Sequence, residues 1–386
     1  MANNNDNKVL NVPHLRFPEF SGEWKMCTIG ELTTKVGSGV TPRGGEAVYK
    51  TEGHPFVRSQ NVGLGNLLLD DIAFIDEETH LRQKSTELQF NDVLLNITGA
   101  SIGRSALVDK QIVGGNVNQH VCIIRTKENL VPSFICSFLL SNYGQRQIDS
   151  FQAGGNRQGL NFEQIKSIKI TIPSKDEQIK IAKLLRAIDE RIAIQNKIID
   201  KLQSLIKGLR VCCMQRNGSD NVYLSEIAQI YQPQTISSAE LTEDGFLVYG
   251  ANGIIGKYKD YNHKTEQICI TCRGNTCGMV NYTKPMSWIT GNAMVINTDK
   301  YQDKVYKKYL YHYLSAYNFN SIISGSGQPQ IVRTPLEKLK ITLPTISEQK
   351  QKAMILDKIQ DKIEINHNVL NLYILQKQYL LRQMFI

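Results

Sequence analysis

Apolar residues in two long segments of the chain recur with an alternation of four and three positions. The first segment carries Ile181, Leu185, Ile188, Ile192, Gln195, Ile199, Leu202, Ile206 and Leu209 at these positions. The second carries Leu356, Ile359, Ile363, Asn366, Leu370, Tyr373, Lys377, Leu380 and Met384. We call these two rows of positions the seams. Such spacing is typical of coiled coils, so it predicts two long helices that pack along their seams.

Each seam carries one amide, and Asn366 lies 171 positions after Gln195 (366 − 195). A buried amide costs stability but fixes the register of paired helices. We therefore expect the helices to pair antiparallel, with the two amides meeting near the crossing. The alternative is two independent helices, each with one tolerated polar residue. At 1.5 Å per residue the first seam spans about 42 Å, comparable to one turn of B-DNA at about 34–36 Å.

The segments that lead into these helices also repeat. The run IKITIPSKDEQIKIAKLL from Ile168 returns as LKITLPTISEQKQKAMIL from Leu339, with Pro173 and Pro344 at the same offset. Fainter matches align two loops of each copy, namely Gly99 with Gly274, Gly103 with Gly278, and Gly115-Asn116 with Gly291-Asn292. The second copy is shorter in its early part and has Tyr223 where Trp24 is expected. The chain is thus predicted to use one scaffold twice.

Each copy mixes short apolar runs with turns rich in glycine and asparagine, and then one helix. The runs are DVLLNITG and HVCIIRT in the first copy, and FLVYGANG, QICITCRG and AMVINTD in the second. The predicted helices are VPSFICSFLLSNYGQRQID, which begins at Pro132, and KVYKKYLYHYLSAY. The predicted fold class is α+β: two similar α+β domains joined by two long antiparallel coiled-coil helices, with a pseudo-twofold internal repeat. Its segments are 1–173 and 216–345 for the domains, and 174–215 and 346–386 for the helices.

Composition narrows the class of protein only slightly. The net charge of +9 permits a polyanionic partner without requiring one. The polar first residues lack a secretory pattern, and the sequence has no apolar run long enough for a membrane span, so a cytoplasmic location is expected. The cysteine cluster CITCRGNTC lacks a second ligand pair, which disfavours a zinc site and favours thiols packed as small apolar groups.

Polar loops carry the candidate recognition chemistry. In the first copy the candidates are Arg58, Ser59, Gln60, Asn61, Arg104, Asn116, Asn118, Gln119, His120, Asn156, Arg157 and Gln158. In the second they are Asn252, Lys257, Arg273, Asn275, Asn292, Gln328, Gln330 and Arg333. Arginine to guanine, and Asn or Gln to adenine, are the pairings that the major groove favours. The alternative for any one of them is a simple role in a turn.

The sequence shows no sign of a catalytic centre. It has neither a complete glycine-rich cofactor loop nor the Asn-Pro-Pro-aromatic motif of adenine methylation, and no convincing triad. The acidic pairs Asp70-Asp71 and Glu77-Glu78 are interpreted as solvated turn residues. We therefore expect a protein that is not an enzyme by itself.

Several segments of the sequence resemble those of a known protein family. The opening PHLRFPEFSGEWKMCTIGEL, the doubled segments IPSKDEQIKIAKLLRAIDE and LPTISEQKQKAMILDKI, and the repeat itself resemble the specificity subunit of type I restriction-modification enzymes. The resemblance covers essentially the whole chain. It implies two target recognition domains, each reading one half of a bipartite site in double-stranded DNA. It offers no transferable contact motif, so the candidate residues rest on loop chemistry.

The resemblance also implies partners. The paired helices would set the half-site spacing and dock two methylation (M) subunits, which bind S-adenosylmethionine and modify adenine. Motor-nuclease (R) subunits would then join to restrict unmodified DNA. No cofactor is expected on this chain, whereas S-adenosylmethionine, Mg and ATP are expected on the partner subunits. A coiled-coil adaptor that reads no DNA sequence, and a self-contained modification enzyme, are the alternatives.

Overall fold

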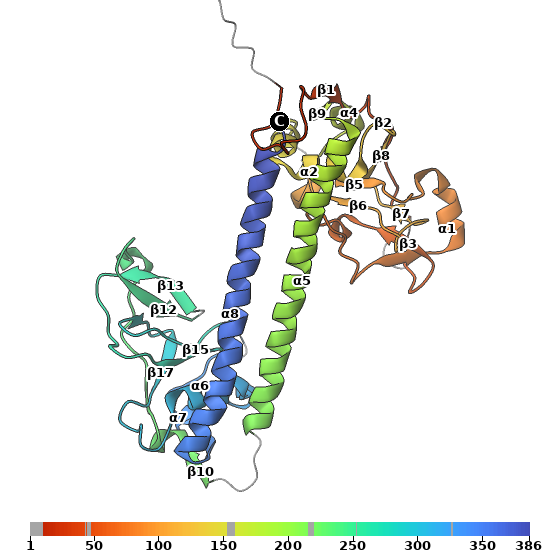
Figure 1. Ribbon diagram of the computed structural model, residues 1–386. Helices are drawn as coiled ribbons and strands as arrows, with labels where there is room; N and C mark the ends of the chain where they lie inside the picture. The colour runs from red at the N-terminus through yellow and green to blue at the C-terminus, as the bar shows by residue number, and fades with distance from the viewer. Residues whose placement is uncertain are drawn as a thin grey trace, which may run out of the picture. The chain divides into compact units, whose positions relative to one another are not determined.

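The computed structural model describes residues 11–42, 44, 48–152, 159–214, 220–251, 253–325 and 327–386. Two compact units divide the chain, one formed by residues 1–196 with 369–386 and the other by residues 197–368. Each unit joins one globular part to a segment of each long helix, α5 (Lys175–Met214) and α8 (Ile346–Gln383) (Figure 1). The division into domains and helices at 1–173, 174–215, 216–345 and 346–386 stays a prediction.

The globular part of the first unit contains a four-stranded and a three-stranded sheet. The four-stranded order is β2 (Thr33–Ser38), β8 (Val121–Thr126), β5 (Val93–Asn96), β6 (Ser105–Leu107), all antiparallel. The three-stranded order is β4 (Ala73–Ile75), β3 (His54–Val57), β7 (Asn116–Val117), with β3 and β7 parallel. A separate pair joins β1 (Lys25–Thr28) to β9 (Lys169–Ile172). The helices are α1 (Glu77–Arg82), α2 (Pro132–Leu140), α3 (Asn142–Ser150) and α4 (Phe162–Ser167).

The second unit repeats the same strand orders. Its four-stranded sheet is β11 (Gln229–Tyr231), β17 (Ala293–Asn297), β14 (Ile268–Thr271), β15 (Val280–Tyr282). Its three-stranded sheet is β13 (Gly253–Tyr258), β12 (Phe246–Gly250), β16 (Trp288–Ile289), with β12 and β16 parallel. The separate pair is β10 (Asp220–Tyr223) with β18 (Lys340–Leu343), and the helices are α6 (Lys307–Ala316) and α7 (Arg333–Glu337). The predicted repeat is therefore confirmed at the level of topology, and α1 marks extra length in the first copy.

The long helices run antiparallel within each unit. In the first unit the early α5 residues Ile181 and Leu185 share a core with Leu380 near the end of α8. In the second unit the late α5 residue Ile206 packs with Leu356 near the start of α8. All seam positions of both helices are buried or half-buried, as the alternation predicted.

The two seam amides belong to different units. Gln195, in the first unit, is buried. Asn366, in the second, is half-buried and its Nδ2 donates to the Lys362 carbonyl oxygen at 2.6 Å. Their predicted meeting at the crossing stays a prediction.

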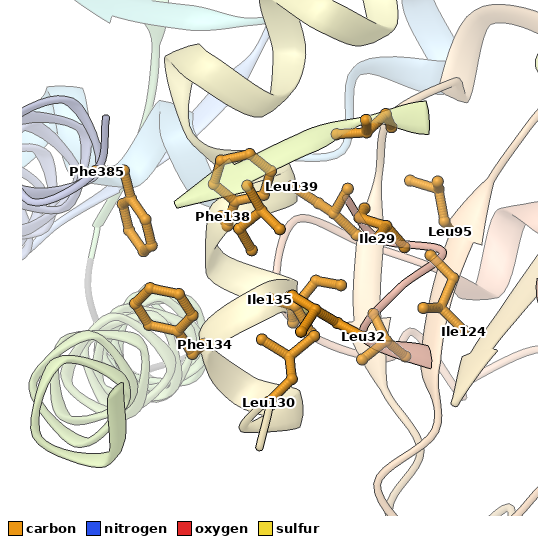
Figure 2. Packing of buried hydrophobic residues seen from close by; sticks show 14 of the residues in the cluster. Ile29, Leu32, Leu95, Ile124, Leu130, Phe134, Ile135, Phe138, Leu139 and Phe385 are labelled. Carbon is orange, nitrogen blue, oxygen red and sulfur yellow. The ribbon is translucent and has the colours of Figure 1, made fainter. Parts of the chain in front are cut away.

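The core of the first unit lies between the four-stranded sheet and the helices. Ile135 and Leu139 of α2, with Leu130 just before this helix, lie toward the sheet residues Leu95 and Ile124 (Figure 2). The other face of α2 turns Phe134 and Phe138 toward Phe385, which follows α8, with ring centroids 5.2 and 6.1 Å apart. Helix α2 thus attaches the sheet to the ends of the long helices.

The segment VPSFICSFLLSNYGQRQID is not one helix, as the sequence predicted, but two. Pro132 does begin α2, but the helix stops at Ser141, whose ψ of 162° is extended. The Ser141 hydroxyl accepts from the Gly144 N–H at 3.3 Å and so caps α3. Serine competes well for such a capping position, which a purely apolar pattern does not reveal.

Strand register also corrects the predicted match of Tyr223 with Trp24. Tyr223 pairs with Lys340 in β10–β18, and Thr28 pairs with Lys169 in β1–β9. Since Lys169 and Lys340 are equivalent, Tyr223 corresponds to Thr28. Tyr223 is accordingly 46% exposed, whereas Trp24 is buried against Phe134.

The segment before β1 is held against the first long helix. Arg16 forms two hydrogen bonds to the Glu177 carboxylate, Nε to Oε1 at 2.7 Å and Nη2 to Oε2 at 2.8 Å. The Leu15 N–H donates to the Gln383 carbonyl oxygen at the end of α8. These contacts give a structural reason for the opening sequence PHLRFPEFSGEW.

Candidate nucleic-acid interface

Four loops of the first unit meet beside the end of the four-stranded sheet. We call residues 57–61, 96–104, 118–120 and 159–161 the first loop cluster. Hydrogen bonds between main-chain groups join these loops: Asn118 N–H to Val57 O (3.1 Å), Ile97 N–H to His120 O (3.0 Å) and Leu160 N–H to Ile97 O (2.8 Å). The Asn96 side chain adds a bond to Ser59 O at 2.8 Å. The loops therefore form one connected surface.

The second unit builds the same cluster from equivalent loops. We call residues 249–251, 271–279, 290–292 and 328–331 the second loop cluster. Its main-chain bonds are Thr290 N–H to Tyr249 O (2.9 Å), Cys272 N–H to Asn292 O (3.1 Å) and Ile331 N–H to Cys272 O (3.0 Å). The Thr271 hydroxyl donates to Ala251 O, as Asn96 does to Ser59 O. The two copies therefore share both their strand orders and the hydrogen bonds that join their loops.

Two pairs of glycines give both clusters their shape. Gly99 and Gly274 have φ of +73° and +85°, and Gly103 and Gly278 have φ of +84° and +90°. Residues with side chains rarely adopt a positive φ of this size. The β5–β6 loop and the β14–β15 loop therefore each need glycine at both positions. The predicted alignment of these glycines is confirmed by their shared conformation.

The other predicted loop alignment is wrong. Parallel pairing places Asn116 of β7 opposite Phe56 and Trp288 of β16 opposite Val248. Asn116 and Trp288 therefore occupy equivalent positions in the two copies. The partner of Asn292 is instead His120, because each precedes the strand that pairs with β5 or β14. The shared Gly-Asn letters lie at different places in the two copies, and a two-letter match cannot fix register.

The candidates of the first copy divide by exposure. Gln60, Arg104 and Gln119 are exposed, and Arg58, Ser59 and His120 are half-buried. Asn61, Asn116 and Asn118 are buried. Their side chains bond to protein groups: Asn61 Oδ1 to Arg58 N–H, Asn116 Nδ2 to Gln83 O, and Asn118 Oδ1 to His120 N–H. In this arrangement the three buried amides hold loops in place, and DNA contact by any candidate stays a prediction.

Gln119 and His120 form a chain of hydrogen bonds whose direction is fixed. The Thr41 N–H donates to Gln119 Oε1 at 3.1 Å, so the Gln119 Nε2 group must face His120 Nε2, 2.9 Å away. That ring nitrogen accepts, and His120 Nδ1–H donates to Thr98 Oγ1 at 2.6 Å. The hydrogen bonds therefore fix the orientation of the His120 ring, and the Gln119 side chain beside it is exposed.

The candidates of the second copy are mostly exposed. Arg273, Asn275, Asn292, Gln328 and Gln330 all lie in the second loop cluster with exposed side chains. Arg333 follows it at the first turn of α7 and pairs with Glu337 at 2.7 Å. Lys257 lies outside the cluster on β13 and pairs with Asp244 at 3.2 Å. Asn156, Arg157, Gln158 and Asn252 lie outside the described residues.

A fifth loop in each unit escaped the sequence reasoning. It follows the first strand of each four-stranded sheet and carries Thr41 in the first copy and Gln232 in the second. Thr41 bonds to Gln119, while Gln232 Nε2 donates to Gly291 O at 3.1 Å. The signal was present as two proline-containing turns, GVTP and QPQT, each directly after the first strand of its four-stranded sheet.

Five thiols are buried, those of Cys27, Cys122, Cys136, Cys269 and Cys272, whereas Cys212 is exposed and Cys213 and Cys277 are half-buried. Cys269 and Cys272 are buried within apolar clusters, as the packing interpretation predicted. Burial raises the pKa of the Cys122 thiol to about 12 and that of Cys136 to about 11, so both stay protonated. Among the described residues no group of three or more His, Cys, Asp or Glu side chains could hold a metal ion. The described helices include none that is long and apolar enough to cross a membrane.

Comparisons with known proteins agree with this architecture. The family model of the type I restriction modification DNA specificity domain matches twice, over residues 21–204 and 217–372. The putative type I restriction enzyme MjaX specificity subunit of Methanocaldococcus jannaschii is 22% identical, over 93% of this chain and 92% of its own length. The EcoprrI specificity subunit of Escherichia coli is 32% identical over 35% of this chain and 34% of its own length.

Solved structures show the same fold. The type I restriction-modification S subunit from M. genitalium superposes with a TM-score of 0.67 at 17% identity, over 97% of this chain and 99% of that one. The family model covers most of this chain in two copies, one on each repeat. The chain therefore belongs to the family of type I restriction-modification DNA specificity subunits.

Proposed function

We propose that the two loop clusters each read one half of a bipartite target in double-stranded DNA. The observation that supports this most is the repeated cluster itself. Its main-chain bonds match between the copies, yet its exposed side chains differ, with Gln60, Arg104 and Gln119 in one and Arg273, Asn275 and Asn292 in the other. A fixed frame with exchanged Arg, Asn and Gln side chains suits the recognition of two different sequences.

The long helices offer the surface for partner subunits. In the first unit Leu372 and Leu375 of α8 are 65% and 59% exposed, and in the second unit Ile365 is 60% exposed. Large apolar side chains at neighbouring positions of a helix are typical of a surface that another protein covers. Two methylation subunits would dock here, with motor-nuclease subunits joining the assembly.

The chemistry would then belong to the partners. S-adenosylmethionine would be held by the methylation subunits, and Mg and ATP by the motor-nuclease subunits, while this chain supplies no catalytic group and binds no cofactor. The exposed polar side chains of the loop clusters suit contact with base edges and phosphates rather than bond making. The assembly would work in the cytoplasm, where cellular and invading DNA are accessible.

A selection from random duplexes tests this proposal. The full chain, alone and with its methylation subunits, is incubated with duplexes that carry a random core, and the bound fraction is sequenced. Two conserved blocks separated by unspecified base pairs are expected. Affinity for a recovered duplex should fall steeply with salt, by a slope of about 0.9 for each phosphate contacted.

The same experiment tests the alternative of a coiled-coil adaptor. An adaptor would retain its methylation subunits but would enrich no sequence and bind duplexes weakly at every salt concentration. That result would contradict the proposed function. Enrichment of a single block would instead limit reading to one of the two units.

A further inference from the structure

Asp71 gathers three side chains of the first loop cluster. Arg58 Nη2 donates to Asp71 Oδ1 at 3.1 Å and to the Asp71 carbonyl oxygen at 2.7 Å. Gln60 Nε2 donates to Asp71 Oδ2 at 2.5 Å, and Asn61 Nδ2 donates to Oδ1 at 3.2 Å. The sequence interpretation of Asp71 as a solvated turn residue is thus incomplete, because its exposed carboxylate organises the segment 58–61.

The Arg58 side chain is held from a second side as well. Its guanidinium lies 5.3 Å from the centre of the Tyr49 ring, a separation suited to a cation–π contact. The arginine is 21% exposed at the side chain, against 62% for Asp71. Arg58 is therefore fixed in one orientation, with the carboxylate on one edge and the ring against its face.

The equivalent place in the second copy lacks this arrangement. The bond from Asn96 to Ser59 O corresponds to the bond from Thr271 to Ala251 O, so Gly250 occupies the place of Arg58. A glycine has no side chain to orient. Any effect of the Asp71 carboxylate on recognition should then be confined to the first half of the target.

We propose that Asp71 is a specificity-determining positioning residue for the first half-site, which aims Arg58 and Gln60 at base edges and keeps Arg58 from binding any phosphate. This inference rests on the proposed function. An unrestrained arginine binds the DNA backbone regardless of sequence, and that contact adds affinity without discrimination. A carboxylate beside it repels phosphates and leaves Nη1 and the outer side of the fixed guanidinium for a base, so one residue both favours the right contact and disfavours the wrong one.

The test compares Asp71→Asn with Asp70→Asn in the full chain. The two substitutions remove the same charge one position apart, and Asp70 is exposed at the surface. Each variant is selected against random-core duplexes, and its affinity is measured for a duplex recovered with the wild type and for a scrambled duplex. Circular dichroism and thermal unfolding establish that each variant is folded.

We expect Asp71→Asn to bind the scrambled duplex more tightly while preference at the first half-site falls about tenfold, the scale of one bidentate base contact. The second half-site should keep its preference, and Asp70→Asn should change neither half. A variant that unfolds is replaced by Arg58→Ala, which should lower first-half preference without tightening the scrambled complex.

Three outcomes separate the ideas. Equal loss of affinity for both duplexes by Asp71→Asn would mean a merely structural role and would overturn the inference. Unchanged preference at the first half-site would overturn it too. Absence of any sequence preference in the wild-type chain would instead remove the proposed function, and this inference with it.

Discussion

Gln178 and Gln349 make the same three hydrogen bonds at the starts of the two long helices. Gln178 Oε1 accepts from the Val131 N–H at 2.9 Å, and its Nε2 donates to the carbonyl oxygens of Asn129 and Pro173, both at 3.1 Å. Gln349 Oε1 accepts from the Tyr306 N–H at 2.7 Å, and its Nε2 donates to Lys304 O and Pro344 O at 3.1 and 2.9 Å. Both side chains are 1% exposed. Each glutamine thus ties a long helix to the N-terminus of α2 or α6.

Replacing either glutamine should loosen its own unit. Gln178→Ala or Gln349→Ala leaves buried main-chain groups without partners, and such groups cost about 1–3 kcal/mol each. We expect the free energy of unfolding to fall by about 2–4 kcal/mol, measured by denaturant titration. Gln203→Ala, on an exposed position of α5, is the control and should change little. Hydrogen exchange should show faster opening at α2 for the first variant and at α6 for the second, and the reverse assignment would contradict the contacts.

Lys377 interrupts the apolar seam of α8 and forms an ion pair and a hydrogen bond within the first unit. Its Nζ lies 2.6 Å from Asp189 Oδ1 on α5 and donates to the Leu64 carbonyl oxygen at 3.1 Å. Burial raises the pKa of the Asp189 carboxyl, and Lys377 opposes that rise. In the second copy the equivalent positions hold Ile206 and Gln360, so the ion pair is particular to the first unit.

The Lys377–Asp189 pair can be tested by transplanting the residues of the other copy. Lys377→Ile alone leaves Asp189 half-buried without its cation, and we expect a loss of about 1–3 kcal/mol, less than for a fully buried pair because Asp189 is partly exposed. Adding Asp189→Gln should recover most of that loss. Denaturant titration of the two variants measures the difference. A double variant as unstable as the single one would mean that Lys377 acts mainly through Leu64.

His312 makes the second unit sensitive to acid. The ring is fully buried, with Arg210 Nε donating to Nδ1 at 3.2 Å and Nε2–H donating to Asp357 Oδ1 at 3.0 Å. Two donors cannot face each other at Nδ1, so the ring is neutral. Burial lowers the pKa of His312, and the Arg210 charge adds to that effect while Asp357 opposes it; Lys308 also pairs with Asp357 at 2.9 Å.

The sign of this pH dependence follows from the lowered pKa. In the unfolded chain His312 takes up a proton below its ordinary pKa of about 6.5, whereas in the folded unit it stays neutral until lower pH. The unfolded state then binds more protons, so stability falls as pH drops below that value. Thermal unfolding from pH 7.5 to 5 should show a smaller decline for His312→Gln than for the wild type. His367→Gln is the control, and an identical change in both variants would exclude His312 as the source.

The strongly periodic and repeated features were predictable from sequence, and the loop details were not. The seams, the glycine pairs at Gly99/Gly274 and Gly103/Gly278, and the strand runs depend on local pattern, which the letters carry directly. The break at Ser141 depends on a capping bond, and the equivalence of Asn116 with Trp288 depends on parallel strand pairing. The burial of Asn61, Asn116 and Asn118 is likewise a tertiary fact, since polar residues near turns look alike in sequence whether they face solvent or protein.

Arg273 is the second-copy candidate whose role can be resolved most directly. Its side chain is exposed in the second loop cluster, while its main chain forms a bridge with Gln330. Arg273→Ala should weaken binding to the second half-site and leave the first unchanged, whether the contact is to a base or to a phosphate. Arg273→Lys separates the two cases, because lysine keeps the charge but loses the planar fork.

For a base contact, Arg273→Lys should fail to restore about 1–3 kcal/mol of discrimination. For a phosphate contact, lysine should restore affinity, and the alanine variant should lower the salt slope by about 0.9. Titrations at several salt concentrations against a duplex recovered by selection measure both quantities. No change at either half-site with Arg273→Ala would remove this residue from the proposed interface.

Shortening the long helices should alter the spacing of the target and leave its sequence alone. Deleting seven residues from each helix, 196–202 and 367–373, keeps the alternation of both seams and removes about 10 Å of helix. If the paired helices set the half-site spacing, selection from random duplexes should recover the same two blocks with about two or three fewer base pairs between them. Deleting five residues from each helix rotates every later seam residue by about 140° around the helix axis, off the packed face, so that variant should lose stability and serves as the mismatched control. Recovery of altered blocks at the original spacing would contradict the proposal that the loop clusters read the sequence and the helices set the spacing.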